Sequence, residues 1–370
     1  MTAKGDAGPI LKISDLRVTF HTYAGDVKAL NGVDLTLRKG ELLGLVGESG
    51  CGKSVTSLAV AGLLPPNAEL ESGTITLAGE DILKMSREQI RRKRLTDLAM
   101  VFQDPMTYLN PVLTIGSQVL EIITQEPKLF TPELVRHRLE EIGPEGEGGP
   151  ELAAERQHLL AVARTGRASG REVERLARHY VISTLRQVRL PNPEKVLSMY
   201  PFELSGGMRQ RVMIAMALVR RPKVLLADEM TTALDVTVQA QILQLLRELR
   251  NEIDASIILI THDLAVVAEV CDRVAVMYAG NIVELADVEE LYSNPLHPYT
   301  KGLLASIPRV DSAQTRQVSI GGSVPNLIFP PSGCRFNPRC PVAFEKCSQV
   351  RPPLREVKPG HLVACLLYEE

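Results

Sequence analysis

The sequence predicts an α/β fold in which helices wrap a set of parallel strands, with a smaller antiparallel flank beside it. Three short apolar runs, Leu42–Val46, Val224–Ala227 and Ile257–Ile260, have the length and continuous hydrophobicity of strands buried on both faces of a parallel sheet. Val236–Ile253 follows the second run and repeats apolar residues with the period of an amphipathic helix. Strands alternating with helices in this way form parallel sheets.

A second group of strands is predicted near the N-terminus. Leu11–Phe20 and Ala29–Leu37 alternate apolar and polar residues, and Gly73–Leu77 adds a third run before a turn at Ala78 and Gly79. Such alternation is typical of antiparallel strands that bury only one face. We therefore expect an antiparallel β flank beside the parallel core.

The region from Pro111 to Phe202 has helical spacing, many charges and no strand run. We expect it to form a helical subdomain, residues 112–203, inserted into the core. Within it, Gly143–Pro150 is a tract of Gly, Pro and Glu that predicts a surface loop, because it holds no apolar surface to bury. After residue 290 the chain becomes Pro-rich and loses its periodicity, so residues 291–370 are expected to form a small irregular C-terminal extension.

The composition limits where the protein can act. Charged residues make up 23% and the net charge is -2, so the chain carries no polybasic surface of the kind that binds nucleic acid. No apolar run approaches the roughly 20 residues that cross a bilayer. Met1–Gly8 also lacks the apolar core of a signal peptide. We expect a cytosolic protein whose association with a membrane depends on other subunits.

One segment matches a phosphate-binding motif in full. Gly47–Ser54 reads GESGCGKS, fits G-x-x-x-x-G-K-[ST], and lies between the strand Leu42–Val46 and a helical run, Ser54–Leu64. Its glycines let backbone N–H groups point at phosphate oxygens, Lys53 supplies a positive charge, and the Ser54 hydroxyl binds Mg²⁺. A Gly-rich turn that matches by chance is the alternative. The expected nucleotide-binding residues are Gly47, Glu48, Ser49, Gly50, Cys51, Gly52, Lys53 and Ser54, with the Cys51 side chain directed away from the phosphates.

A pair of carboxylates follows a second buried strand. Val224–Glu229 reads VLLADE, so Asp228 stands at the strand end, where it can hold Mg²⁺, and Glu229 stands beside it, where it can polarise a water. The alternative is that both carboxylates cap the next helix. The phosphate-binding motif upstream favours the catalytic interpretation.

Leu204–Gln210, LSGGMRQ, resembles the signature of ABC transporters and lies just before the carboxylate pair, as it does in that family. Ser205, Gly206 and Gly207 begin an apolar helix and offer N–H groups and a positive dipole end to an anion. An ordinary helix N-cap is the alternative. The resemblance implies a P-loop NTPase cassette with a RecA-like core, residues 9–290, in which this segment closes on the ATP held by a partner subunit.

The resemblance extends to other positions, residue by residue. It implies that Gln103 contacts Mg²⁺ and senses the membrane partner, that His262 contacts the γ-phosphate, and that Asp235, in Ala233–Asp235, crosses the dimer interface. Phe20 stands where the family stacks an aromatic ring on adenine, with Tyr23 as the second choice and core packing as the alternative for both.

Two positions depart from the general family pattern. Met208 replaces the usual Gln of the signature, as in the peptide-importer branch, and Met230 replaces the Pro that usually follows the catalytic Glu. Because Pro fixes φ and Met does not, the second change is expected to alter the loop backbone without abolishing hydrolysis.

Several segments resemble the ATPases of oligopeptide and dipeptide importers: Phe102–Thr114, Thr231–Leu243, Leu296–Pro308 and the tail Gly333–Cys365. The resemblance covers most of the chain except residues 127–179, which form an extra insertion relative to the family. A solvated surface elaboration is the favoured interpretation of this insertion, and a partner contact is the alternative.

The tail contains four cysteines, Cys334, Cys340, Cys347 and Cys365. Relatives in the peptide-importer branch carry an iron–sulfur cluster at such a tail, so the resemblance implies a 4Fe–4S cluster on these thiolates. Zinc is the less favoured alternative, because structural zinc usually takes a tight C-x₂₋₄-C pair and the tail has none. Unligated, reduced thiols are the third interpretation.

The resemblance implies an ATPase that powers import of dipeptides or oligopeptides from the cytoplasmic face of the membrane. Its implied partners are a second ABC ATPase, either a related paralogue or an identical copy, two transmembrane permease subunits and an extracytoplasmic substrate-binding protein. Importers of nickel or oligosaccharide have similar ATPases and stay open as alternatives. A soluble ABC ATPase outside transport and a catalytically inactive cassette are the alternatives from other classes.

Overall fold

The computed structural model describes residues 8–102, 105–124, 131–142, 150–166, 168–230, 234–306 and 320–369. It divides into two compact units. Unit 1 consists of Met1–Met100, Lys223–Glu229 and Arg250–Glu370, and unit 2 of Val101–Pro222 and Met230–Leu249.

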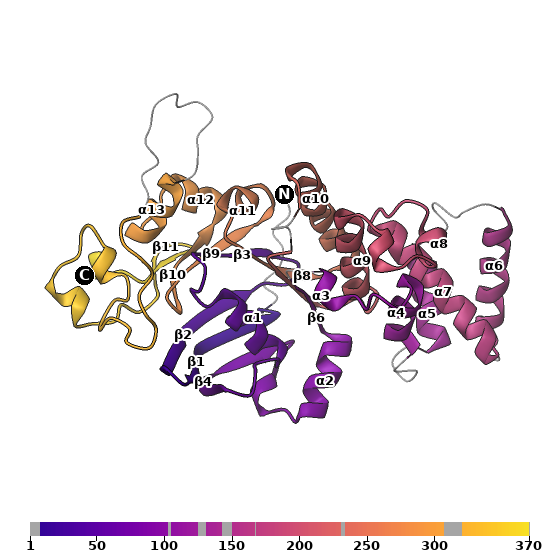
Figure 1. Cartoon of the computed structure of the whole chain (residues 1–370), viewed down its shortest axis with the longest axis horizontal. Coiled ribbons are helices and arrows are strands. Elements are labelled where there is room, and N and C mark those ends of the chain that lie inside the picture. Colours follow the sequence, from indigo (N-terminus) through magenta and orange to yellow (C-terminus); the bar gives the residue numbers. More distant parts are fainter. Residues whose placement is uncertain are drawn as a thin grey trace. The chain divides into compact units, whose positions relative to one another are not determined.

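Among the described residues, a large sheet has the strand order β11-β12-β10-β9-β3-β8-β7-β6 (Figure 1). Strands β9, β3, β8 and β7 are parallel, whereas β10, β11 and β12 pair antiparallel with their neighbours. The parallel strands are buried along their whole length, which explains their continuous hydrophobicity. The strands are β3 (Leu42–Val46), β6 (Leu98–Val101), β7 (Val224–Asp228), β8 (Ser256–Thr261), β9 (Arg273–Tyr278), β10 (Asn281–Asp287), β11 (Arg355–Lys358) and β12 (His361–Val363).

A second sheet in unit 1 has the order β2-β1-β4-β5 and is antiparallel. Its strands are β1 (Leu11–Thr22), β2 (Gly25–Leu37), β4 (Ala68–Leu77) and β5 (Glu80–Asp81). Leu11 pairs with Leu37 on one side and Leu77 on the other, and all three are buried. The predicted antiparallel flank is present.

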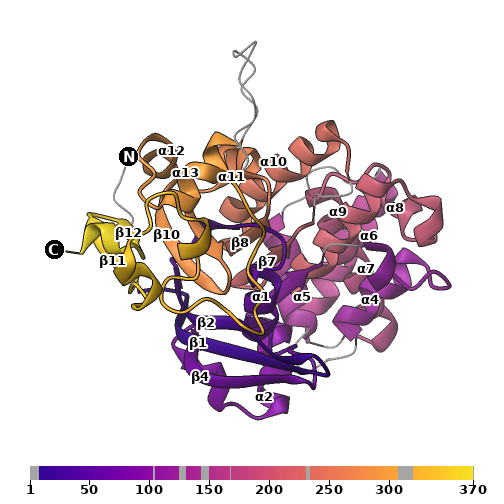
Figure 2. The ribbon, with the colours of Figure 1, turned by 60° about the vertical axis from the view of Figure 1, so that its left-hand side comes forward.

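The helices of unit 1 pack on both faces of the large sheet. Residues of α1, such as Val60, share one apolar core with both sheets, and α11 contributes Leu264 and Val267 to a second core. Figures 1 and 2 agree in showing α11 and α12 on the face of the large sheet opposite to β1, β2 and β4. These helices are α1 (Lys53–Ala61), α2 (Arg87–Thr96), α11 (Leu264–Val270), α12 (Val288–Ser293) and α13 (Pro298–Ala305), with short 3₁₀ turns at η1 (Ile82–Lys84), η3 (Asn337–Arg339), η4 (Glu345–Ser348) and η5 (Leu366–Tyr368).

In the described residues of unit 2, the regular elements are helices, apart from the end of β6. Helix α7 lies at its centre and contacts α4, α5, α6, α8 and α9. A capping box between Ser169 and Glu172 fixes the start of α7. The elements are α3 (Pro105–Tyr108), α4 (Ile115–Thr124), α5 (Pro132–Ile142), α6 (Pro150–Arg164), α7 (Gly170–Gln187), α8 (Pro193–Val196), η2 (Pro201–Glu203), α9 (Gly206–Leu218) and α10 (Val236–Ile253), which runs into unit 1 at Arg250.

The α/β fold predicted from the sequence is confirmed. The C-terminal part is more regular than predicted, because β12 pairs with β10 and β11 pairs with β12, so the tail extends the large sheet by two strands. The sequence pattern did not indicate these strands, since β12 has only three residues.

Candidate functional site

Three parallel strands of unit 1 lead to the phosphate-binding motif, to Asp228 and Glu229, and to His262. Strand β3 leads into the phosphate-binding motif, β7 ends at Asp228, and β8 ends at Thr261, one residue before His262. The strands are adjacent and in register, with Val46 opposite Thr261 and Asp228 opposite Ile260. Because the carboxyl ends of parallel strands share one edge of the sheet, residues from distant parts of the chain meet there.

The backbone of the phosphate-binding loop depends on glycine at two positions. Gly47 has φ +156°, and a Cβ there would lie 2.1 Å from the Met277 carbonyl oxygen. Gly52 has φ +109° and precedes the first turn of α1, where a Cβ would lie 2.8 Å from Leu30. At Gly47 the obstacle is backbone, and at both positions the positive φ favours glycine. Cys51 is buried in the core.

Lys53 is buried and directed into the loop. Its Nζ donates to the Gly47 carbonyl at 2.9 Å and to the Glu48 carbonyl at 3.2 Å. The Glu229 carboxylate is 4.0 Å away. The ammonium is therefore held where a phosphate could replace the carbonyls as its partner.

Asp228 accepts hydrogen bonds from two hydroxyls of α1. The Ser54 Oγ lies 3.2 Å from Asp228 Oδ1, and the Ser57 Oγ lies 3.5 Å from Oδ2. Burial raises the pKa of the Asp228 carboxyl, and the neighbouring Glu229 charge raises it further, whereas the bond from Ser54 lowers it. A buried carboxylate beside a hydroxyl supplies the oxygen ligands that Mg²⁺ prefers. Ser57 was not predicted, although it lies one helical turn after Ser54.

Glu229 has a strained backbone, with φ +46°. Its N–H donates to the Ile260 carbonyl at 2.9 Å, a bond that ties the residue to β8. His262 Nδ1 lies 3.7 Å from Glu229 Oε1, and its side chain is 56% exposed. A positive φ in a residue other than glycine is uncommon and clusters at functional sites.

The two candidate adenine-stacking residues differ in exposure. Phe20, on β1, is partly buried and packs against the core of unit 1. Tyr23, in the turn after β1, is fully exposed.

The predicted signature residues lie in unit 2. Ser205 caps α9, because its side chain accepts from the Met208 N–H at 3.3 Å. Gly207 faces Val238 at the start of α10, where a Cβ would lie only 2.7 Å from Cγ1. Asp235 accepts from the Val238 N–H at 2.9 Å. Gln103 and Ala233 lie outside the described residues.

The structure adds contacts to the phosphate-binding loop that the sequence did not predict. The Glu48 N–H donates to the Tyr299 hydroxyl at 3.0 Å, and the Glu48 carboxylate binds the Arg339 guanidinium. Tyr299 is the second residue of α13 and Arg339 belongs to the tail, so both partners lie far from Glu48 in the sequence. No local sequence signal could have indicated them.

The four tail cysteines are all described and are neither fully exposed nor disulfide-bonded. Burial raises the pKa of the Cys334 thiol to about 11, and the charges of the other three thiols act in the same direction. The Cys334 N–H also donates to the Cys347 carbonyl at 2.8 Å. Within the described residues, no three histidine, cysteine, aspartate or glutamate side chains gather as a ready-made cage for a metal ion.

Comparison with known proteins decides the family. Residues 30–232 match the family model described as ABC transporter. Residues 283–347 match the model described as oligopeptide/dipeptide transporter, C-terminal region. The chain belongs to the ABC transporter family. It is an ABC-type ATPase with the C-terminal region of the oligopeptide/dipeptide group.

Relatives match over nearly the whole chain. The oligopeptide transport ATP-binding protein OppD of Escherichia coli is 43% identical over 98% of this chain and 94% of its own. The dipeptide transport ATP-binding protein DppD of Bacillus subtilis is 43% identical over 98% of this chain and 95% of its own. Similarity of this extent includes the tail, which the ABC transporter model does not reach.

Solved structures support the fold. The cassette MJ0796, a bacterial ABC transporter cassette in dimeric form, aligns with a TM-score of 0.56 over 75% of this chain and 98% of its own at 23% identity. The protein cbiO1 from Clostridium perfringens, part of the ABC transporter complex cbiONQ, aligns with a TM-score of 0.55 at 26% identity over 78% and 92% of the two chains. As for membrane insertion, the helices described here include none with the length and hydropathy of a membrane span.

Proposed function

We propose that this ABC ATPase powers the import of dipeptides or oligopeptides. The observation that carries the proposal is the C-terminal match at residues 283–347, together with relatives named for oligopeptide and dipeptide transport along the whole chain. In this proposal the chain lies at the cytoplasmic face of the membrane, with a second ABC ATPase, two transmembrane permease subunits and an extracytoplasmic binding protein as partners.

The residues at the strand ends take distinct roles in the proposed reaction. The phosphate-binding loop, residues 47–54, holds the β- and γ-phosphates through its N–H groups and Lys53. Ser54, Asp228 and Gln103 hold Mg²⁺. Glu229 orients and deprotonates the attacking water. His262, whose Nδ1 lies 3.7 Å from Glu229 Oε1, contacts the γ-phosphate. Phe20 stacks on adenine.

A complete site in this proposal needs two ATPase subunits. Ser205, Gly206 and Gly207 of one subunit close on the γ-phosphate held by the loop of the other, because the start of α9 presents N–H groups and a positive dipole end. Asp235 lies at the same subunit boundary. ATP drives closure since it is bound better by the closed pair, and hydrolysis removes that preference.

Replacement of the proposed base tests these roles. Glu229→Gln should lower the ATPase rate by at least about 100-fold, the contribution of a general base, while ATP binding persists and the closed dimer accumulates. Lys53→Ala should instead lose affinity for the nucleotide. Glu269→Gln, which neutralises an exposed carboxylate on α11, is the matched control. Wild-type hydrolysis by the Glu229→Gln protein would remove Glu229 from the mechanism.

The cargo needs a separate experiment. The ATPase, reconstituted with its permease subunits, should hydrolyse ATP faster when the binding protein carries a peptide. Stimulation by nickel or by an oligosaccharide, with none by peptides, would assign the transporter to another cargo while leaving the ATPase roles intact.

We propose further that Cys334, Cys340, Cys347 and Cys365 hold a 4Fe–4S cluster. The support is the chemistry of the donor set: four thiols in one tail segment, mutually close enough to influence the Cys334 pKa, within a part of the chain that has little regular structure. Four thiolates are the common ligand set of such clusters. When bound, the cluster would cross-link the tail and so stabilise its fold.

Metal analysis of the full chain tests the cluster. The protein purified without oxygen should contain iron and acid-labile sulfide and should absorb broadly in the visible range. Cys347→Ser should lose both, whereas Cys271→Ser, outside the tail, should lose neither. The proposal of a cluster would be overturned if the purified protein contained zinc without iron, or no metal.

A further inference from the structure

An ion pair joins the cysteine-bearing tail to the phosphate-binding loop. The Arg339 Nη1 lies 2.8 Å from Glu48 Oε2, and Nη2 lies 3.0 Å from Oε1, so the pair is bidentate. The Arg339 side chain is 7% exposed and that of Glu48 is 27% exposed. Such fork-to-fork pairs fix geometry as well as charge.

The surroundings hold both partners in place. The Arg339 guanidinium lies over the Tyr278 ring, 5.7 Å from its centroid, and Nη1 is 3.3 Å from the Tyr278 hydroxyl. Its Nε donates to the Gly321 carbonyl at 2.9 Å. On the other side, the Glu48 N–H donates to the Tyr299 hydroxyl, which is itself fully buried.

Glu48 lies at a sensitive point of the loop. Its carbonyl accepts from Lys53 Nζ at 3.2 Å, so a shift of the Glu48 backbone also displaces the lysine that meets the phosphates. Its carboxylate brings a negative charge beside a site built for anions. Without Arg339, that charge would oppose the binding of ATP.

Arg339 is equally sensitive to the order of the tail. It ends a 3₁₀ turn, Asn337–Arg339, that lies between Cys334 and Cys340. The Asn337 N–H donates to the Cys334 carbonyl at 2.9 Å, and the Cys340 N–H donates to the Asn337 carbonyl at 3.3 Å. The position of the guanidinium therefore follows the conformation of the segment between these two cysteines.

We propose that Arg339 is a positioning residue for the phosphate-binding loop, and that through Glu48 the order of the cysteine-bearing tail sets the affinity for Mg–ATP. Arg339 contacts no reacting atom. It neutralises the Glu48 carboxylate and fixes the loop that carries Lys53.

Charge compensation provides the test, with the full chain and a non-hydrolysable ATP analogue with Mg²⁺ as the probe. Arg339→Gln should weaken binding about tenfold, the coupling typical of contacting residues, because the Glu48 charge is left unpaired. Adding Glu48→Gln to this variant should restore most of the affinity, since the unpaired charge is then gone. In steady-state hydrolysis, KM should rise for Arg339→Gln while kcat changes little.

A matched control and a second substitution keep the result interpretable. Arg355→Gln removes another tail guanidinium, paired with Glu369, and should leave the affinity unchanged. Should the Arg339→Gln protein fail to fold, Arg339→Met keeps the stem packed on the Tyr278 ring and carries the same test. Wild-type affinity in the Arg339 variant, or no recovery in the double variant, would overturn the proposed role of Arg339.

A separate substitution tests the link between the cysteines and the nucleotide site. Cys340→Ser should weaken binding of the analogue in the wild-type background and should have no further effect when Glu48→Gln and Arg339→Gln are present. An equal loss in both backgrounds would show that the tail acts by another route, and no loss in either would show that tail order does not reach the site.

Discussion

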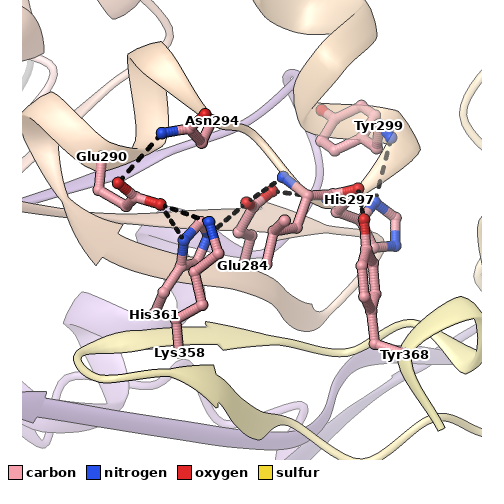
Figure 3. Close-up of polar contacts among 9 residues, drawn as sticks. Glu284, Glu290, Asn294, His297, Tyr299, Lys358, His361 and Tyr368 are labelled. Carbon is pink, nitrogen blue, oxygen red and sulfur yellow. Dashed lines mark hydrogen bonds and ion pairs between the residues drawn. The ribbon is translucent and has the colours of Figure 1, made fainter.

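The attachment of the tail to the large sheet depends on one buried carboxylate. Glu284, on β10, is fully buried and accepts three hydrogen bonds, from the Leu296 N–H at 2.6 Å, the His297 N–H at 2.9 Å and His361 Nε2 at 2.7 Å (Figure 3). His361 begins β12. The Glu284 side chain therefore joins the segment before α13 to β12.

We predict that Glu284→Ala detaches β12 from β10. The substitution removes the acceptor of the buried His297 N–H, the partly buried Leu296 N–H and the buried His361 Nε2, and each unsatisfied buried group costs about 1–3 kcal/mol. A total of about 4 kcal/mol corresponds to an increase of roughly 10³-fold in local opening. Because the chain has two compact units, a global melting curve would mix several transitions.

Native-state hydrogen exchange measures local opening directly. Protection of the amides in peptides that cover β10 and β12 should fall in the Glu284→Ala protein by that factor, while peptides from unit 2 keep their protection. Glu290→Ala is the control, because Glu290 binds the exposed side of the same network, at Lys358 and the other nitrogen of His361. Unchanged protection of β12 in the Glu284→Ala protein would refute the inference that this carboxylate holds the tail.

Three further predictions follow from close contacts and burial. Gly47→Ala should abolish nucleotide binding, since its Cβ would meet the Met277 carbonyl oxygen at 2.1 Å, whereas Gly50→Ala, which meets nothing within 4 Å, should weaken binding only through backbone strain. Gly207→Ala should destabilise the packing of α9 on α10 in a denaturation assay, and Val238→Ala in the same chain should relieve the loss by removing the atom 2.7 Å away. Burial lowers the pKa of His297 from 6.5 to about 3. The free energy of unfolding should therefore fall as the pH is lowered from 6.5 to 3, by at most about 1.4 kcal/mol per pH unit, because the unfolded chain takes up the proton and the folded chain does not. His297→Gln should flatten that dependence in denaturation midpoints measured across the range, and an unaltered slope would contradict the assignment.

The buried parallel strands were the best-predicted part of the fold. The predicted run Leu42–Val46 has the same bounds as β3, and Val236–Ile253 has the same bounds as α10. The first is a short, continuously apolar run and the second is a long amphipathic repeat, and both patterns are set by the local composition. The positions of the strand ends follow from these runs. The motifs that come directly after the runs were therefore enough to expect Lys53, Asp228 and His262 at one edge of the sheet.

The tail could not be predicted in the same way. Its strand β12 has three residues, and it pairs with β10 through contacts such as that of His361 with Glu284, 77 residues away. The ion pair of Arg339 with Glu48 spans 291 residues. Short strands and single side-chain pairs at such separations leave no periodic signal, because their stability comes from the partner and not from the local sequence. The strain at Glu229 is another case, since the residue type gives no sign of a positive φ.

The tail is thus attached at two places with different consequences. The network around Glu284 lies at β10 and holds β12 in the sheet, whereas the pair of Arg339 and Glu48 reaches the phosphate-binding loop. If the ion pair of Arg339 with Glu48 served stability alone, Glu284→Ala and Arg339→Gln would both reduce the hydrogen-exchange protection of the tail. The affinity of the folded protein for Mg–ATP would then stay at the wild-type value in both variants. The charge on Glu48 separates the two cases, because the Glu48 carboxylate is left unpaired only when the Arg339 guanidinium is removed or displaced. A drop in affinity for Mg–ATP that the Glu48→Gln substitution reverses therefore reports the unpaired charge of Glu48 and not a loss of tail stability that leaves this ion pair intact.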